Sequence, residues 1–295
     1  MALVGRETEI GLLRRAVDDA VGGRARSVLI AGEPGIGKTA LAEETADAAT
    51  KAGATALWGA CWEGEGAPAF WPWVQIIRSY ASGRPTGDLL DEMGEGAADV
   101  ARLVPEVGGR FLRLTPEGDT DPEQARFRLF DHVSRFLRAA ASKQPLCLVF
   151  DDLHWADRSS LMLLRFFAQA MRDAPVLVLG TYRDVELSSD HRQTLTDLSG
   201  ERISLSGLAR SEVAALMQIT TGSEPPADLT TAVFGRTTGN PFFVKELARL
   251  LAAQGLEKPV IAIPEGVRDV VRRRLARQSQ DAVALLGAAS VLGPE

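Results

Sequence analysis

Residues 27–39 read SVLIAGEPGIGKT, an apolar run followed by a glycine-rich stretch that ends in Lys38 and Thr39. The second half matches the pattern G-x-x-x-x-G-K-[ST], with a strand-like run before it and an amphipathic helix pattern after it. Glycines let such a loop curl until its backbone N–H groups and the helix N-terminus point at a phosphate. The stretch therefore predicts a phosphate-binding loop, a P-loop, between a strand and a helix.

The residues of this loop are expected to contact a bound nucleotide. Lys38 can reach the β- and γ-phosphates, and the Thr39 hydroxyl is placed for Mg²⁺. The alternative is a glycine-rich turn that carries a surface lysine. The expected contact residues are Gly32, Glu33, Pro34, Gly35, Ile36, Gly37, Lys38, Thr39 and Ala40.

Strand-like apolar runs alternate with helical patterns from residue 27 to about residue 205, which indicates βαβ units and a parallel sheet. A helix pattern at residues 10–20 precedes them, and a long insertion separates the second run from the third. We therefore expect a three-layer α/β/α fold around five parallel strands. The expected strands are Ser27–Ala31, Thr55–Cys61, Leu146–Phe150, Val176–Thr181 and Arg202–Leu205.

Two acidic residues, Asp151 and Asp152, end the third of these runs. Beside a P-loop, Asp151 is expected to bind Mg²⁺ through water, and Asp152 to act as the general base that polarises the attacking water. The alternative for Asp152 is a helix N-cap or a solvated loop carboxylate. His154 and Trp155 are expected to pack beside the acidic pair, because no second His or Cys accompanies them as a metal ligand.

Arg183 follows the fourth strand, in the run Leu179-Gly180-Thr181-Tyr182-Arg183-Asp184. Ligands of open α/β sheets sit at the carboxyl ends of the strands. Arg183 is therefore expected to sense or neutralise the γ-phosphate. The alternative is that Arg183 only pairs with Asp184 or Asp151.

After Leu208 the pattern changes to helices only, which suggests a small helical domain after the α/β domain. The expected helices are Ser211–Ile219, Asp228–Phe234 and Asn240–Ala253. Residues 259–264 look like a linker, and helical spacing resumes at residues 267–275. The expected domains are residues 1–207, 208–257 and 258–295.

Composition excludes several classes of protein. The 33 basic and 39 acidic residues give a net charge of −6, which lacks the overall basic footprint of a nucleic-acid binder. No apolar run approaches the roughly 20 residues that span a bilayer, and the N-terminus lacks a signal-peptide pattern, so we expect a cytoplasmic protein without membrane contact. Cys61 and Cys147 are expected to be small core residues.

Five motifs in order resemble those of STAND-class ATPases, within the AAA+-like group of P-loop NTPases. In particular they resemble the nucleotide-binding region of large LuxR-type transcriptional regulators. The motifs are Val4-Gly5-Arg6-Glu7, Gly32–Thr39, Val149–Asp157, Gly180-Thr181-Tyr182-Arg183 and Gly239-Asn240-Pro241-Phe242.

The resemblance implies further roles at the edges of the site. Val4, Gly5 and Arg6 would line the adenine side of the pocket, and Pro241 of the helical domain would contact the base. The other interpretation makes Arg6 an exposed residue at a helix start and Pro241 an ordinary first residue of a helix. Helices at Glu265–Arg277 and Asp281–Leu292 would begin a winged helix.

The function implied is a slowly hydrolysing, ATP-dependent signalling switch, with ATP·Mg²⁺ bound between the first two domains. ADP-bound and ATP-bound states would control self-association and output, which requires that nucleotide bind the two states unequally. Further C-terminal domains of the same polypeptide would make any contact with DNA. Two alternatives remain open, a constitutive ATPase motor or P-loop kinase, and a scaffold that holds ADP without catalysis. GTP is disfavoured because Asn240 is the only Asn, which rules out a guanine-reading Asn-Lys-x-Asp element.

Overall fold

A computed structural model describes residues 3–64, 66–111, 121–198, 200–254, 275 and 280–292 of the chain. The chain forms two compact units, Met1–Ser206 and Gly207–Glu295. Within the described residues, none of the helices combines the length and the apolar composition needed to cross a bilayer.

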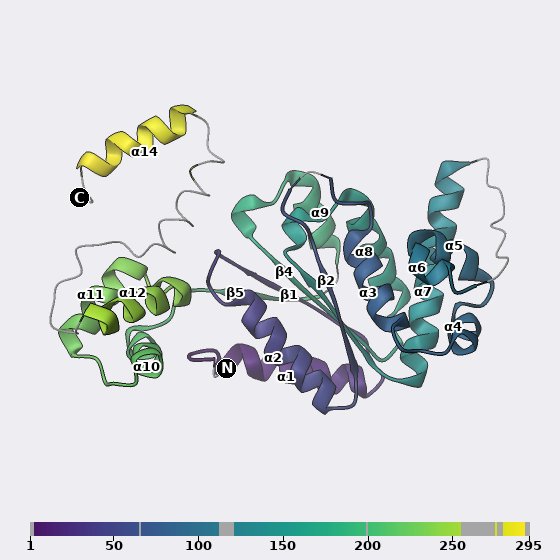
Figure 1. The fold of residues 1–295 in the computed structure, drawn as a ribbon, viewed down its shortest axis with the longest axis horizontal. Coiled ribbons are helices and arrows are strands. Elements are labelled where there is room, and N and C mark those ends of the chain that lie inside the picture. The colour runs from purple at the N-terminus through teal and green to yellow at the C-terminus, as the bar shows by residue number, and fades with distance from the viewer. Residues whose placement is uncertain are drawn as a thin grey trace. The chain divides into compact units, whose positions relative to one another are not determined.

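The first unit is built on a five-stranded sheet (Figure 1), and every strand pairing in it is parallel. The order across the sheet is β2-β3-β4-β1-β5. This confirms the predicted fold, with strand bounds that differ from the expected ones by one residue at most at each end. The strands are β1 (Arg26–Gly32), β2 (Thr55–Ala60), β3 (Leu146–Asp151), β4 (Val176–Tyr182) and β5 (Glu201–Leu205).

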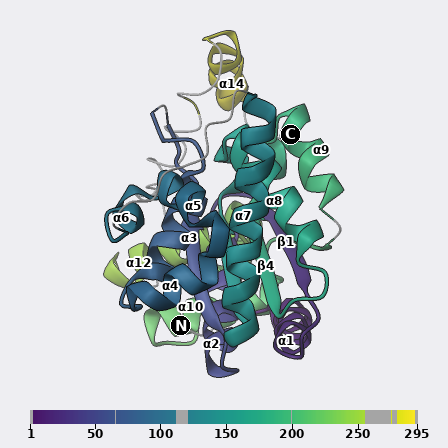
Figure 2. The same ribbon diagram turned by 90° about the vertical axis from the view of Figure 1, so that its right-hand side faces the viewer.

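Helices cover both faces of the sheet, which explains why its central strands are apolar without interruption. On one face, α1 (Glu7–Val21) and α2 (Lys38–Lys51) pack against Val28 and Ile30 of β1. On the other face, α3 (Trp71–Ala81), α7 (Pro122–Lys143) and α8 (Arg158–Ala170) pack against alternate residues such as Leu29. Figures 1 and 2 show the two layers of helices. Cys147 lies in the core of the first face and is fully buried, as expected of a small core residue.

The long insertion after β2 is helical and adds its own apolar residues to the core. It contains α3, α4 (Thr86–Met93), the 3₁₀ turn η1 (Gly94–Gly96), α5 (Ala97–Leu103) and α6 (Pro105–Gly108). Trp73 of α3 is fully buried. The centroid of its ring lies 4.9 Å from that of Phe150 and 5.4 Å from that of Phe167. The insertion is thereby fixed to the strand that carries Asp151.

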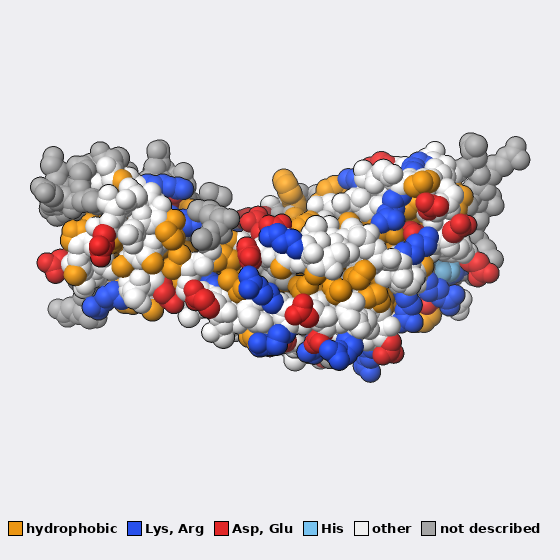
Figure 3. Space-filling model, turned by 90° about the horizontal axis from the view of Figure 1, so that it is seen from below, with side chains coloured by type: hydrophobic (Ala, Val, Ile, Leu, Met, Phe, Trp, Pro, Cys, Tyr) orange, Lys and Arg blue, Asp and Glu red, His pale blue; other side chains and the backbone are white. Residues whose placement is uncertain are grey.

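Short elements follow the strands at the carboxyl edge of the sheet. The 3₁₀ turn η2 (Leu153–Trp155) lies between β3 and α8, and η3 (Asp184–Glu186) lies between β4 and α9 (Ser189–Asp197). Acidic and basic side chains are interspersed on the face of the molecule shown in Figure 3.

In the second unit, the helices within the described residues are α10 (Arg210–Thr221), α11 (Ala227–Thr237), α12 (Pro241–Gln254) and α14 (Gln280–Leu292). α10, α11 and α12 pack together, with Val213, Met217 and Val244 buried between them. Of the two helices expected to begin a winged helix, the first lies outside the described residues except for Leu275, and the second corresponds to α14. The winged helix therefore stays a prediction.

Candidate nucleotide-binding site

The P-loop connects β1 to α2, and its backbone requires glycine at particular positions. Gly37 caps α2 with a φ of 106°, a left-handed conformation that favours glycine. A Cβ at Gly32 would lie 2.9 Å from Cγ2 of Ile36 and 3.1 Å from the carbonyl oxygen of Leu205. The glycines therefore let the chain turn tightly into the N-terminus of α2, where backbone N–H groups lack partners within the helix.

Lys38 is buried inside this loop, with only 6% of its surface exposed. Its ammonium group donates hydrogen bonds to the carbonyl oxygens of Gly32 and Glu33, both at 3.0 Å. Burial lowers the pKa of Lys38, and the carboxylate of Asp152 opposes that shift. The alternative of a surface lysine is therefore wrong.

Thr39 and Asp151 meet across the site. The Thr39 hydroxyl donates to the two carboxylate oxygens of Asp151, at 3.3 and 3.2 Å. One residue comes from the start of α2 and the other from the end of β3, 112 positions later. The two oxygen-bearing groups predicted to bind Mg²⁺ thus lie together.

Thr181, for which no role was predicted, holds the acidic pair in position. It is fully buried on β4, its hydroxyl donates to Oδ1 of Asp151, and it accepts from the backbone N–H of Asp152 at 2.9 Å. The register pairs Phe150 with Gly180, so the next residues along the two strands are Asp151 and Thr181. The signal in the sequence that could have predicted this role is the hydroxyl residue near the end of β4, the strand that follows β3.

Asp152 has the left-handed backbone conformation, with a φ of 57°. Asp152 precedes η2, but its side chain makes no cap hydrogen bond there, and Asp157 caps α8. The other alternative, a solvated loop carboxylate, stays open, because 34% of the Asp152 side chain is exposed. Burial raises the pKa of Asp152, and the charge of Asp151 raises it further. A carboxylate with a raised pKa is a stronger base when ionised.

Arg183 pairs with Glu186, not with Asp184 or Asp151 as the alternative expected. Its Nη1 lies 2.9 Å from Oε1 and 3.2 Å from Oε2 of Glu186, and 17% of its side chain is exposed. The pair spans the turn η3, whose local geometry the strand pattern did not predict. After burial, the charge of Arg183 contributes to lowering the pKa of Lys38.

Arg6 is buried, so the alternative of an exposed residue at a helix start is wrong. Its guanidinium donates to the carbonyl oxygen of Ile36 in the P-loop at 3.2 Å and to that of Ser206 at 2.7 Å. Arg6 thus links the start of α1 to the phosphate-binding loop. Val4 and Gly5 precede it directly, and their contact with adenine stays a prediction.

Pro241 is the first residue of α12 in the second unit, the helix position expected for it. The side chain of Asn240 accepts a hydrogen bond from the backbone N–H of Phe242 at 3.1 Å, which fixes this helix start. Contact between Pro241 and a base stays a prediction.

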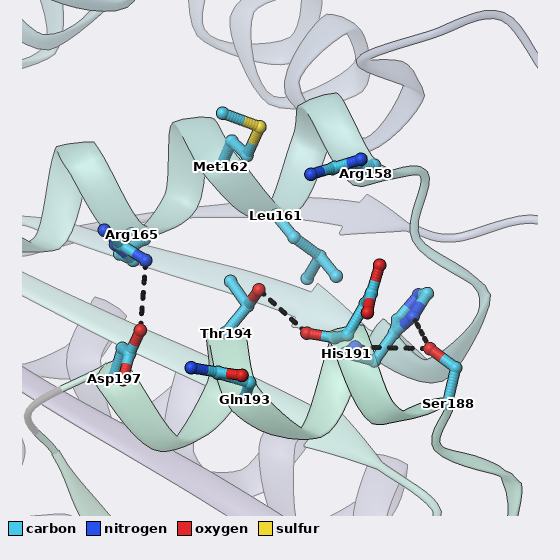
Figure 4. Close-up of a pocket in the computed structure, with 10 residues that line it drawn as sticks. Arg158, Leu161, Met162, Arg165, Ser188, His191, Gln193, Thr194 and Asp197 are labelled. Carbon is cyan, nitrogen blue, oxygen red and sulfur yellow. Dashed lines mark hydrogen bonds and ion pairs between the residues drawn. The ribbon is translucent and has the colours of Figure 1, made fainter.

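A surface pocket of about 370 Å³ lies between α8 and α9 (Figure 4). Its charged side chains have both signs, and Arg165 pairs with Asp197 at 3.0 Å. His191 on its wall contacts the carbonyl oxygen of Ala156 at 2.8 Å through Nε2, and contacts Ser188 through Nδ1. These contacts attach α9 to the loop that follows Asp152.

The fold and the P-loop together define an AAA+ ATPase-type nucleotide-binding module. The chain belongs to the AAA ATPase domain family, which matches residues 2–179. A protein of Rhizobium meliloti (strain 1021), described as uncharacterized protein R02095, is 25% identical over 281 residues. The match covers 89% of this chain and 26% of that protein, so the chain spans about a quarter of the relative's length.

Solved structures share the fold at low sequence identity. A STAND protein with a tetratricopeptide repeat sensor from Pyrococcus horikoshii is 16% identical with a TM-score of 0.51, covering 98% of this chain and 34% of that one. Cdc6p from Pyrobaculum aerophilum is 15% identical with a TM-score of 0.50, covering 86% of this chain and 64% of that one. Both similarities concern the fold alone.

Proposed function

We propose that this chain binds ATP with Mg²⁺ at the P-loop and hydrolyses it slowly, as the switch module of a larger signalling protein. The observation that carries the proposal is the convergence of Lys38, Thr39 and Asp151 at one edge of the sheet. Membership of the AAA ATPase domain family supports nucleotide binding in general.

The residues present suit a magnesium ion. The Thr39 hydroxyl and the Asp151 carboxylate are oxygen donors held 3.2–3.3 Å apart, and Mg²⁺ prefers oxygen ligands together with the phosphates of its nucleotide. When bound there, the ion would neutralise charge on the β- and γ-phosphates. Thr181 keeps the Asp151 carboxylate oriented towards Thr39.

The groups around this position support a role in hydrolysis. Lys38 and Arg183 would stabilise the negative charge that develops on the transferred phosphoryl group. Asp152 would orient a water molecule and accept its proton as the water attacks the γ-phosphate. The raised pKa of Asp152 makes its carboxylate a better proton acceptor than an exposed aspartate.

The switch role has separate support. The resemblance of the five motifs to LuxR-type regulators suggests a transcriptional context, and the R02095 protein is much longer than this chain. The Pyrococcus horikoshii protein is described as a signal transduction ATPase with a repeat sensor, which is the kind of architecture proposed here. We expect ATP and ADP to give different oligomeric states, measured by light scattering after gel filtration.

The test of nucleotide identity is direct. We expect an adenine nucleotide to be released when the purified protein is denatured and its supernatant is separated by chromatography. ATP with Mg²⁺ should raise the melting temperature more than GTP does, because a ligand that binds only the folded state stabilises it. Equal shifts with ATP and GTP would contradict the adenine preference. Rapid steady turnover, or transfer of phosphate to an added acceptor, would favour a motor or kinase instead.

A further inference from the structure

His154 is a buried imidazole without a hydrogen-bond partner among the described residues. Its side chain is fully buried, and neither Nδ1 nor Nε2 forms a hydrogen bond. A buried polar group left in this way costs free energy, so native proteins rarely retain one without a reason. The position of His154 therefore needs an explanation.

Two carboxylates flank this ring. Nδ1 lies 3.8 Å from Oδ1 of Asp152, and Nε2 lies 3.6 Å from Oε2 of Glu186. Both distances exceed those of a formed hydrogen bond. Asp152 is the proposed general base, and Glu186 is the partner of Arg183. His154 thus stands between the proposed base and the arginine that is proposed to contact the γ-phosphate.

The imidazole can donate a hydrogen bond to only one of these carboxylates at a time. Burial, followed by the charges of Arg183 and Lys38, lowers the pKa of His154 to about 3, so the ring is neutral. A neutral imidazole has one N–H donor and one lone pair, so it can donate a hydrogen bond to only one of the two carboxylates that flank it. A hydrogen bond to one carboxylate therefore leaves a lone pair facing the other.

The surrounding loops keep His154 between the two carboxylates. The contact between His191 and the carbonyl oxygen of Ala156 attaches the start of α9 to the loop that contains His154. Figure 4 shows His191 and Ser188 joined at this helix start, just after Glu186 in the chain. The segments that carry Glu186 and His154 are therefore connected, so a change in hydrogen bonding is available without separating them.

We propose that His154 is a positioning residue that couples Arg183 to Asp152 through its single ring proton. This inference rests on the proposed function. While Arg183 is paired with Glu186, the proton sits on Nδ1 and faces Asp152. When Arg183 turns to the γ-phosphate, its guanidinium leaves Glu186 and the proton sits on Nε2, facing Glu186. Asp152 then no longer accepts a hydrogen bond from His154, so its carboxylate can accept the proton of water.

The change of tautomer balances in protons. One proton leaves Nδ1 through the Asp152 carboxylate to water, and one enters Nε2 from water through the Glu186 carboxylate. The side chains of Asp152 and Glu186 are 34% and 29% exposed, so both reach solvent. The imidazole is neutral both before and after the exchange.

The first test determines directly which ring nitrogen of His154 carries the proton. The chain has three histidines, so nitrogen-15 labelling of histidine and substitution of each in turn assigns the ring signals. We expect the Nδ1–H tautomer of His154 in the nucleotide-free protein, and the Nε2–H tautomer with Mg²⁺ and a non-hydrolysable ATP analogue. Arg183→Ala should show the Nε2–H tautomer without nucleotide. The same tautomer in all three samples would overturn the proposal.

The second test uses two variants matched in chemistry. The amide nitrogen of Gln reaches the place of Nε2, whereas that of Asn reaches the place of Nδ1. We expect His154→Gln to hydrolyse ATP in a single turnover within about threefold of wild type, and His154→Asn to be about tenfold slower or more. ATP affinity should be unchanged in both variants. Equal rates, or a loss of affinity that matches the loss of rate, would contradict a positioning role.

The two tests separate this inference from the proposed function. Failure of the wild type to bind any nucleotide in a fluorescence titration would contradict the proposed function. The comparison of Arg183→Ala with wild type needs no nucleotide, and it would still support or overturn the role of His154. The same comparison decides the matter if the two His154 variants do not fold.

Discussion

The P-loop and the ends of β3 and β4 form two halves of one site, and they differ in how their buried polar groups are satisfied. In the P-loop half, Lys38 and Arg6 both donate to backbone carbonyl oxygens. In the other half, the ring nitrogens of His154 and Nε of Arg183 are buried without a partner among the described residues. The P-loop half is therefore already arranged for binding, whereas the β3–β4 half retains groups that gain hydrogen bonds by rearranging.

The largest effect is expected at Asp152, in the β3–β4 half. Asp152→Asn keeps the size of the side chain and removes the proton acceptor, so hydrolysis should fall by roughly 10²-fold or more while ATP binding survives. Paired measurements of ATP affinity and single-turnover hydrolysis check this. Asp190→Asn, a change at an exposed acid on α9, should leave both values unchanged.

Asp151→Asn distinguishes the role of Asp151 from that of its neighbour Asp152. Because the Asp151 carboxylate faces the Thr39 hydroxyl, its loss should weaken Mg²⁺-dependent binding itself. A defect in hydrolysis alone for Asp151→Asn would show that the two roles have been assigned the wrong way round.

Lys38→Ala addresses the P-loop half. A hydrogen bond to a charged group contributes about 1.5–3 kcal/mol, so nucleotide affinity should fall by about ten- to a hundredfold. Titration with a fluorescent ATP analogue measures it. Lys51→Ala, at the exposed end of the same helix, is the matched control. Wild-type affinity in Lys38→Ala would show that Lys38 does not contribute to nucleotide binding.

Thr181→Val tests the connection between β4 and the acidic pair. Valine has nearly the same shape but leaves the backbone N–H of Asp152 without its acceptor, so the free energy of unfolding should fall by about 1–3 kcal/mol. Urea unfolding measures the loss. Thr181→Ser keeps the hydroxyl, and it should retain more of the stability. Equal losses in the two variants would assign the effect to packing.

The smallest effect expected is a change in the pH dependence of stability. The pKa of His154 falls from 6.5 to about 3 on folding, so between these values the unfolded chain binds a proton there that the folded chain does not. Stability due to this group is therefore present above pH 6.5 and declines as the pH falls towards 3. The unfolding free energy of His154→Gln should decrease less than that of wild type between about pH 7 and pH 5. Parallel curves would mean that folding leaves the pKa of His154 unchanged.

Local patterns in the sequence predicted much of this molecule. The five strands, the P-loop and the acidic pair could each be predicted from a short run of neighbouring residues. Glu186 and Thr181 were not predicted, because their roles depend on a turn and on the register between β3 and β4. The burial of Arg6 depends on carbonyl groups 30 and 200 positions away, which no local pattern encodes.

The order of strands has a consequence for how the protein is made. β1 carries the P-loop, yet its partners are β4 and β5, with Val28 opposite Leu179 on one side and Glu201 on the other. A ribosome that has released residues 1–170 has therefore supplied β2 and β3 as a pair but neither neighbour of β1. Closing so long a stretch of chain slows folding. The nascent protein acquires its phosphate-binding loop only after most of the first unit has been synthesised.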